Sequence, residues 1–335
     1  MRKLLAISFS CFVAAGALAQ TTSHTYHMNH VPSTAALNEI ATLLRALVFD
    51  GRYTDTTPPV SVDPADQSIT VSGTADQQAT ANWIIQHLDV TAPPQNTQQY
   101  TAGESDPAVR IYFLAHTHAQ APLNELVTVM RTVGDIQRIF TYPPLNAVGI
   151  RTTTGKAQFA DWMVQQMDVS PTSRPVTARH DLPLPACGDA QAEVRFLTNV
   201  GSQIGVNELV TILRAVADIQ MIFTHSSEPL GIAFRSCPST LELGDWLIQQ
   251  TDVAPGSRSN SDKYEYQVPN SVDPVVRVYY LKGNDAAEYK TCVTAIRDAA
   301  KVSHIFYSLT TGAVALRGTP DQIAVADQVI RQYDR

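Results

Sequence analysis

One pattern recurs four times along this chain, and such a repeat constrains the fold more than any other feature, because every copy must fold into the same kind of unit. The two clearest copies run from Asn124 to Val133 and from Asn207 to Val216. Both begin Asn-Glu-Leu-Val-Thr and share an arginine at the eighth position. This arginine is found in all four copies, at intervals of 86, 83 and 83 residues: Arg45, Arg131, Arg214 and Arg297.

An aspartate near the end of each copy gives a second, independent marker. In the first copy it stands in Leu88-Asp89-Val90. It recurs at intervals of 79, 84 and 82 residues: Asp89, Asp168, Asp252 and Asp334. Two markers with nearly the same period predict four tandem copies of one small domain.

The order of secondary structure is expected to be the same in each copy, over about 65 residues. In the second copy, the β-rich run 109–113 predicts the first strand. Apolar residues at every third or fourth position of 126–133 predict a helix with one apolar face. The runs 138–142 and 147–151 predict two further strands, and a second helix follows, as at 320–333 in the last copy.

The predicted fold class is therefore α+β, with each β-α-β-β-α repeat forming a three-stranded sheet covered on one face by two helices. Polar, proline-rich stretches separate the repeats, as linkers do. The alternating run 264–268 allows an extra edge strand in the last linker. The predicted repeats are 20–90, 107–169, 190–253 and 274–335, and the linkers are 91–106, 170–189 and 254–273.

The first 19 residues predict a secretory signal peptide. Arg2 and Lys3 precede an apolar run, and Ala17-Leu18-Ala19 offers a cleavage site. The run is too short to span a membrane, so we expect an exported, periplasmic protein of bacteria. The formal net charge of −7 disfavours nucleic acids and anionic membranes as partners, because both require positive charge.

A hydrophobic strand, a Gly-Thr turn into a helix and a closing Leu-Asp-Val are found together in the stretch 61–90. The strand and the turn recur in the stretch 276–323, with Gly318-Thr319 at the turn. These motifs resemble the repeated periplasmic domain of bacterial secretins, the outer-membrane channels of type II and type III secretion and of type IV pili. The resemblance covers most of the chain that follows the signal peptide.

The resemblance implies a KH-like, ring-building fold and a non-catalytic role in protein–protein assembly. It also implies protein partners in the cell envelope, further copies of the same chain included. Secretins follow these domains with a barrel-forming region, whereas this chain ends at Arg335, directly after the fourth predicted repeat. We therefore expect an assembly module, accessory to a secretion or type IV pilus system, rather than the channel. The alternative is an autonomous envelope scaffold that binds peptidoglycan or an outer-membrane protein.

The tryptophans Trp83, Trp162 and Trp246 each precede a closing aspartate by six residues. Helical periodicity directs them away from the apolar stripe of their own helix. We expect each one to pack on the following linker or repeat. Gln328 replaces the tryptophan in the fourth copy, as in a terminal capping unit. The alternative is that a small rotation of the helix returns each tryptophan to its own core.

Six arginines alternate with apolar neighbours in the predicted first and third strands. We expect them to share the open face of each sheet. That face is either an interaction surface for anions or for a carboxylate-lined partner, or a solvated surface on which the arginine stems cover apolar area. The six are Arg110, Arg195 and Arg277 in the first strands, and Arg151, Arg235 and Arg317 in the third strands.

Three cysteines follow the signal peptide. Cys187 precedes the first strand of the third repeat and Cys237 follows its third strand. If these strands are antiparallel neighbours, the two cysteines meet and can form a disulfide. Cys292 occupies an apolar position of its helix and is interpreted as a buried, small hydrophobic residue.

The sequence contains none of the common catalytic motifs, such as Gly-x-Ser-x-Gly, His-Glu-x-x-His or a phosphate-binding glycine loop. Two groups of histidines, at 24–30 and at 116–118, lack a recognised metal-ligand spacing. We therefore expect no enzyme activity, no cofactor and no metal.

Overall fold

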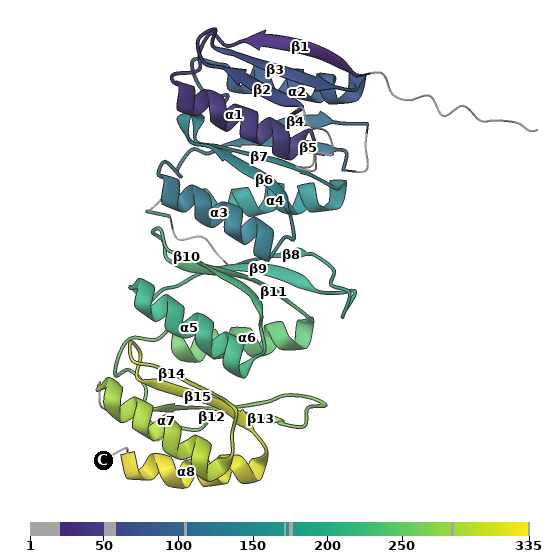
Figure 1. The fold of residues 1–335 in the computed structure, drawn as a ribbon. Coiled ribbons are helices and arrows are strands. Elements are labelled where there is room, and N and C mark those ends of the chain that lie inside the picture. Colours follow the sequence, from purple (N-terminus) through teal and green to yellow (C-terminus); the bar gives the residue numbers. More distant parts are fainter. Residues whose placement is uncertain are drawn as a thin grey trace, which may run out of the picture.

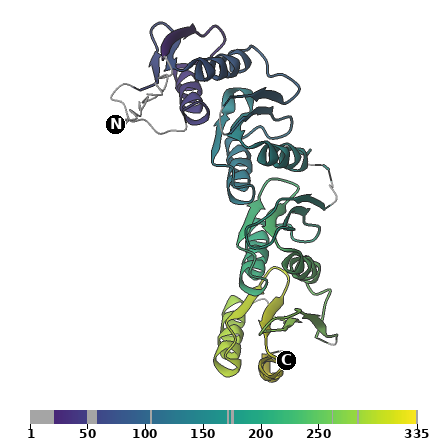
Figure 2. The ribbon, with the colours of Figure 1, turned by 90° about the vertical axis from the view of Figure 1, so that its right-hand side faces the viewer.

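The computed structural model describes residues 21–49, 58–103, 106–170, 172–173, 177–260, 262–282 and 285–333. They form four similar units, which stack one on the next into an elongated body (Figure 1). The view turned by 90° shows the same column, with the first and last units at opposite ends (Figure 2). The predicted signal peptide 1–19 and the closing residues Asp334 and Arg335 lie outside the described residues.

Each unit contains the predicted order of strands and helices. The first unit has β1 (Thr22–His27), α1 (Thr34–Leu47), β2 (Val60–Asp63), β3 (Ser68–Gly73) and α2 (Ala75–Leu88). The second has β4 (Gln98–Thr101), β5 (Ala108–Phe113), α3 (Gln120–Thr132), β6 (Arg138–Tyr142), β7 (Ala147–Thr152) and α4 (Thr154–Met167). The third has β8 (Ala178–Asp181), β9 (Gln191–Phe196), α5 (Gln203–Val216), β10 (Met221–His225), β11 (Gly231–Ser236) and α6 (Pro238–Thr251). The fourth has β12 (Tyr264–Gln267), β13 (Val275–Tyr280), α7 (Ala286–Ala300), β14 (His304–Ser308), β15 (Ala313–Gly318) and α8 (Pro320–Tyr333).

All four sheets are antiparallel, and the α+β fold class is confirmed. The first sheet has the expected three strands, in the order β1-β3-β2. The other sheets have four, in the orders β4-β5-β7-β6, β8-β9-β11-β10 and β12-β13-β15-β14. The additional strands β4, β8 and β12 are formed by segments predicted to be linkers, because their alternating residues pair along the free edge of the first strand. The exact boundaries of repeats and linkers stay a prediction.

The arginine that marks each repeat ties the first helix of a unit to its second strand. Its guanidinium donates to a main-chain carbonyl of that strand, which would otherwise lack a partner at the edge of the sheet. The four hydrogen bonds are Arg45 to Val60 at 2.8 Å, Arg131 to Ile139 at 2.8 Å, Arg214 to Ile222 at 2.9 Å and Arg297 to Ile305 at 3.0 Å.

Each of the last three sheets is buried on both faces. Its own two helices cover one face, and the first helix of the preceding unit covers the other: α1 lies against β6, α3 against β10 and α5 against β14. Gly149 of β7 shows how closely the units approach, since a Cβ atom there would lie 3.0 Å from Leu47 and 3.2 Å from Leu43 of α1. Val109 and Ile111 of the second unit accordingly belong to the same apolar cluster as α1.

Candidate functional site

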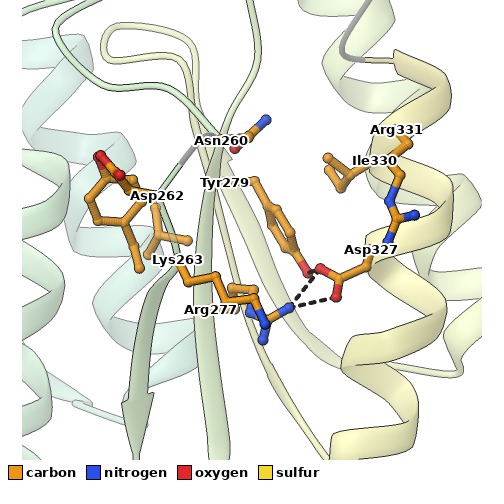
Figure 3. A pocket seen from close by; sticks show the side chains of 10 residues that line it. Asn260, Asp262, Lys263, Arg277, Tyr279, Asp327, Ile330 and Arg331 are labelled. Atoms are coloured by element: carbon orange, nitrogen blue, oxygen red, sulfur yellow. Dashed lines mark hydrogen bonds and ion pairs between the residues drawn. The ribbon is translucent and has the colours of Figure 1, made fainter.

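The fourth unit contains a pocket of about 200 Å³ between β12, β13 and α8 (Figure 3). Arg277 of β13 forms ion pairs there with Asp327 of α8, at 2.7 Å, and with Glu265 of β12. The hydroxyl of Tyr279 donates to Asp327 at 2.8 Å. The lining residues are Asn260, Asp262, Lys263, Tyr264, Arg277, Val278, Tyr279, Asp327, Ile330 and Arg331. The buried charge of Arg277 is thus balanced by two carboxylates, one on each neighbouring element.

The second unit repeats this arrangement. The Nε atom of Arg110 lies 3.7 Å from Asp161 of α4, and the hydroxyl of Tyr112 donates to Asp161 at 2.8 Å. Burial, with the charge of Asp161, raises the pKa of Tyr112 well above its usual value, so the phenol stays a neutral donor. The first-strand arginines of these two units therefore hold the second helix against the sheet.

The third unit has a glutamate where the other two have this arginine. Glu193 stands opposite Phe234 in the sheet register, as Arg110 stands opposite Ile150. Its buried carboxylate lies 2.8 Å from Nε of Arg179 in β8 and 2.9 Å from Nε of Arg195. Both arginines also form ion pairs with Asp245 of α6, so that two cations and two anions form one cluster around the buried Glu193.

Burial raises the pKa of Glu193 from 4.5 to about 7, against the opposing effect of Arg195. The folded state then holds this proton more tightly than the unfolded state does. We therefore expect the contribution of Glu193 to the stability of the third unit to be complete below pH 4.5. This contribution should be lost as the pH rises to about 7. The loss is about 3 kcal/mol at most.

Urea unfolding of the wild type and of Glu193→Gln at pH 5 and pH 8 measures this effect. The variant has no proton to lose at this position, so its unfolding free energy should lack this contribution to the pH dependence. An identical change between the two pH values in both proteins would contradict the prediction.

The third-strand arginines lie on the other face of the sheet, so the prediction that all six arginines share one open face is wrong. Arg151 stands opposite Val109, whereas Arg110 stands opposite Ile150. Because directly opposed residues lie on the same face, this offset of one residue places the two arginines on opposite faces. Neither face is open, since Arg151 and Arg235 on one face are only 2% and 7% exposed and Arg277 on the other is 8% exposed.

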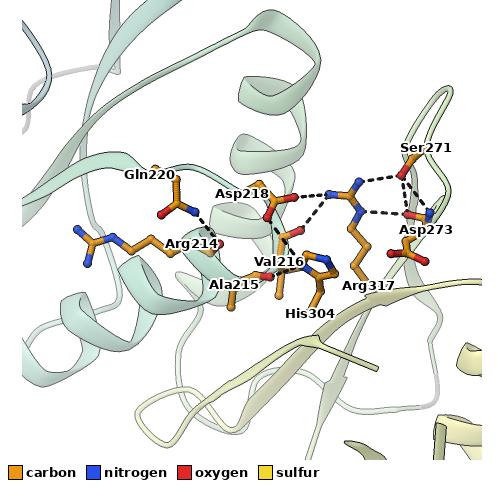
Figure 4. A network of polar contacts seen from close by, with 9 residues as sticks. All are labelled: Arg214, Ala215, Val216, Asp218, Gln220, Ser271, Asp273, His304 and Arg317. Carbon is orange, nitrogen blue, oxygen red and sulfur yellow. Dashed lines mark hydrogen bonds and ion pairs between the residues drawn. The ribbon is translucent and has the colours of Figure 1, made fainter. Parts of the chain in front are cut away.

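Arg151 and Arg317 bind the C-terminal end of the first helix in the preceding unit. Nη1 of Arg151 donates to the carbonyl of Leu47, the last residue of α1, at 3.1 Å. Nη1 of Arg317 makes the same contact with Val216, the last residue of α5, at 3.4 Å, and pairs with Asp218 at 3.2 Å (Figure 4). A helix C-terminus has partial negative charge, which these guanidinium groups complement.

The second strand adds to this contact at two of the three junctions. Nε of Arg138 donates to the carbonyl of Ala46 at 3.1 Å, and the ring Nδ1 of His304 lies 2.9 Å from the carbonyl of Ala215 (Figure 4). At the middle junction Met221 occupies this position, and Arg235 contacts its sulfur at 3.0 Å. Burial there lowers the pKa of Arg235.

A glutamate in the first half of α3 and of α5 makes a second contact with the next unit. Glu125 of α3 accepts hydrogen bonds from the backbone and the hydroxyl of Ser226. Glu208 of α5 accepts from the hydroxyl of Ser308 at 2.7 Å and from the backbone of Thr310 at 3.0 Å. Helix α5 is therefore bound to the next unit both through Glu208 and at its C-terminal end. Sequence reasoning missed this contact.

Each of the three tryptophans contacts the edge strand formed by the following linker. Trp83 stacks on Tyr100 of β4, with ring centroids 5.4 Å apart. The other two pairs are Trp162 with His180 of β8, at 5.2 Å, and Trp246 with Tyr266 of β12, at 5.6 Å. The tryptophan rings thus link the second helix of one unit to the sheet of the next.

Cys187 and Cys237 are joined in a disulfide, with their Cα atoms 6.0 Å apart. The antiparallel pairing of β9 with β11 brings them together, since Gln191 stands opposite Ser236. Cys292 is a free, buried thiol, and burial raises its pKa to about 11. A thiol that stays protonated is a poor nucleophile, in keeping with a packing role.

The closing aspartates of the first three repeats, Asp89, Asp168 and Asp252, have a role that their sequence position did not reveal. Each carboxylate accepts hydrogen bonds from the backbone of the loop between the first strand and the first helix. Asp252, for example, accepts from Thr198, Asn199 and Val200 at 2.7–2.9 Å. Asp89 and Asp168 make equivalent contacts, so the marker is a loop cap.

Replacing this carboxylate by an amide should destabilise the unit. In Asp252→Asn the side chain keeps one acceptor oxygen, and an NH2 group replaces the other oxygen. This NH2 group is a donor, so it cannot accept from the backbone N–H groups that face it. We expect the unfolding free energy to fall by about 2 kcal/mol. Asp298→Asn, on the exposed side of α7, is the matched control and should change it by less than about 0.5 kcal/mol. Equal effects of the two substitutions in urea unfolding would contradict the loop-capping role.

Within the described part of the chain, no cluster of three or more histidine, cysteine or acidic side chains could hold a metal ion. In that same part, every helix is too short or too polar to cross a membrane.

Comparison with known proteins finds matches among solved structures alone, since no model of a protein family and no curated protein matches the chain. ExeD from Aeromonas hydrophila is 15% identical over 71% of this chain and 42% of its own, with a TM-score of 0.17. The N-terminal domain of the secretin XcpQ from Pseudomonas aeruginosa is 13% identical over 45% of this chain and 63% of its own, with a TM-score of 0.19. The pilotin–secretin complex AspS–GspD of ETEC matches 94% of this chain and 55% of its own, at 11% identity and a TM-score of 0.18.

Two of these three matches are described as secretins. The chain spans 42–63% of the length of these proteins.

Proposed function

We propose that this chain is a non-catalytic protein-interaction or assembly module of the bacterial cell envelope, accessory to a secretin-type secretion or type IV pilus system. The observation that carries the proposal is the repeated junction. Each of α1, α3 and α5 is buried against the next sheet, and the arginines and glutamates described above serve that packing. Stacked repeats of this kind offer a long lateral surface, and repeat proteins commonly bind partners through such surfaces. Export by the predicted signal peptide would place the module in the periplasm.

A second candidate is an autonomous envelope scaffold that binds peptidoglycan or an outer-membrane protein. The polar outer face of the first sheet favours it. Hydroxyl pairs cover that face, with Ser23 and Ser72 2.7 Å apart and Thr25 and Thr70 2.8 Å apart. The units within the chain are joined by apolar contacts. A polar face of this kind gives a second copy of the chain no apolar surface on which to pack in the same way.

Light scattering of the chain from Gln20 onward, over a range of concentrations, distinguishes the two candidates. A discrete large oligomer supports assembly into a secretin-like ring. A monomer at all concentrations, retained by purified cell-wall material or by an outer-membrane protein, supports the scaffold. Turnover of a substrate by the purified chain would overturn both.

A further inference from the structure

Among the described residues, the sheet of the first unit has no counterpart of the strand that completes the other three. In those units β5, β9 and β13 each pair on their outer edge with β4, β8 or β12. β1 is the corresponding strand of the first unit, and among the described residues it pairs only with β3. One edge position, filled three times in this molecule, is therefore open here.

The backbone of β1 presents hydrogen-bonding groups at this edge. Met28, just beyond β1, donates its backbone N–H to Gln67 at 2.8 Å. Because hydrogen-bonded and non-bonded pairs alternate along an antiparallel ladder, the N–H and C=O groups of Ser23 and Thr25 point away from β3. The equivalent residue of Ser23 in the second unit is Val109, which pairs with Tyr100 of β4. Ser23 and Thr25 thus present the groups that a further strand would bind.

Exposed edges are usually shielded by short length, charge or proline. β1 has six residues, whereas β4, β8 and β12 have four each. Its sequence, Thr-Ser-His-Thr-Tyr-His, contains no lysine, arginine, acidic residue or proline. Five of its six residues are exposed, so this edge is accessible to another chain.

Cleavage at Ala19, as the sequence predicts, would remove the segment that fills this position in the other units. β4, β8 and β12 begin 10, 13 and 11 residues before the strand with which they pair. The same distances before Thr22 fall within the predicted signal peptide 1–19. With the predicted signal peptide removed, a strand added at this edge would come from another molecule.

The filled positions indicate which side chain such a strand should bring. Glu265 of β12 stands opposite Arg277 and forms an ion pair with it. Arg179 of β8 stands opposite Glu193, with Nε 2.8 Å from the carboxylate. The register places His24 at this position of β1, because His24 stands opposite Val71 as Arg277 stands opposite Leu316. A histidine at this position can pair with an acidic side chain, as Arg277 pairs with Glu265.

We propose that the open edge of β1 binds an extended segment of a partner protein by antiparallel strand addition, with an acidic side chain opposite His24. Main-chain hydrogen bonds to Ser23 and Thr25 supply the affinity, and the side-chain pair sets the preference, as in other cases of strand addition. The proposal rests on the interaction function proposed above and names one place at which it acts.

The probe is a fluorescent peptide with the sequence of residues 262–269, which contains Glu265 of β12, and its matched control has Glu265→Lys. Binding to the chain from Gln20 onward is measured by anisotropy at pH 6, where imidazoles are partly protonated. We expect the control peptide to bind about threefold to fivefold more weakly, and His24→Glu to reverse this preference. Thr25→Pro removes an outward N–H and should abolish binding of both peptides.

Hydrogen exchange measures the same site without a mutation. Saturating peptide should slow exchange at the amides of Ser23 and Thr25 about tenfold or more. Unchanged exchange at these amides with about 1 mM peptide, or a preference that His24→Glu leaves unaltered, would overturn the proposal. Protection that appears without peptide and rises with protein concentration would assign the edge to a second copy instead. A partner that wild type and Thr25→Pro capture equally would overturn this site and leave the interaction function standing.

Discussion

Replacing Leu47 by aspartate should lower the free energy of unfolding by about 5 kcal/mol and separate the first unit from the second. Leu47 is fully buried, and its side chain approaches Gly149 of the second unit at the junction. The substitution removes an apolar side chain from a packed site, which costs about 2–5 kcal/mol. It also places a carboxylate there, beside the C-terminal end of a helix, which adds a further penalty.

Ala299 of α7 is the matched control, because it occupies the position of Leu47 relative to the repeated arginine and is exposed. Ala299→Asp should change stability by less than about 0.5 kcal/mol. Urea unfolding followed by tryptophan fluorescence measures both variants, and Trp83 and Trp162 report on the two sides of the junction. Similar losses for the two variants would show that helix propensity, and not the junction, determines the effect.

The repeat and its helices could be predicted from the sequence because the apolar face of a helix has a fixed period. The segment 126–133 displays this period, and α3 (Gln120–Thr132) forms there. The strands β4, β8 and β12 were harder to predict, since they have four residues each and alternate between exposed and half-buried positions. Of the three, only the segment around Tyr264 suggested a strand, through its alternating aromatic residues.

The arginine faces could not be predicted because they depend on the register between two strands, which one strand's alternation does not specify. One sequence signal was nevertheless present. Ser72 stands in the first unit where the others have Arg151, Arg235 and Arg317. The arginine is thus found in the units whose sheet is covered by a preceding helix, and a serine in the unit whose outer face is polar.

The junction glutamate follows the same logic from the other side. Glu39, Glu125 and Glu208 occupy one position in α1, α3 and α5, and Thr291 occupies it in α7. The glutamate is kept in the helices that lie against a following sheet. The repeated arginine and closing aspartate marked the period correctly, but their hydrogen bonds to backbone groups leave no trace in a sequence pattern.

Removing the disulfide between Cys187 and Cys237 should destabilise the third unit by about 4 kcal/mol. The bond closes a loop with a sequence separation of 50 residues. Closing a loop of this length lowers the conformational entropy of the unfolded state, which corresponds to a stabilisation of about 4 kcal/mol. Urea unfolding of Cys187→Ser/Cys237→Ser against the oxidised wild type measures the loss. A reducing agent should lower the wild type to the stability of the variant and leave the variant unchanged. If reduction left the wild type within about 0.5 kcal/mol of its oxidised value, the pairing of β9 with β11 and the apolar core would by themselves account for the stability of this unit.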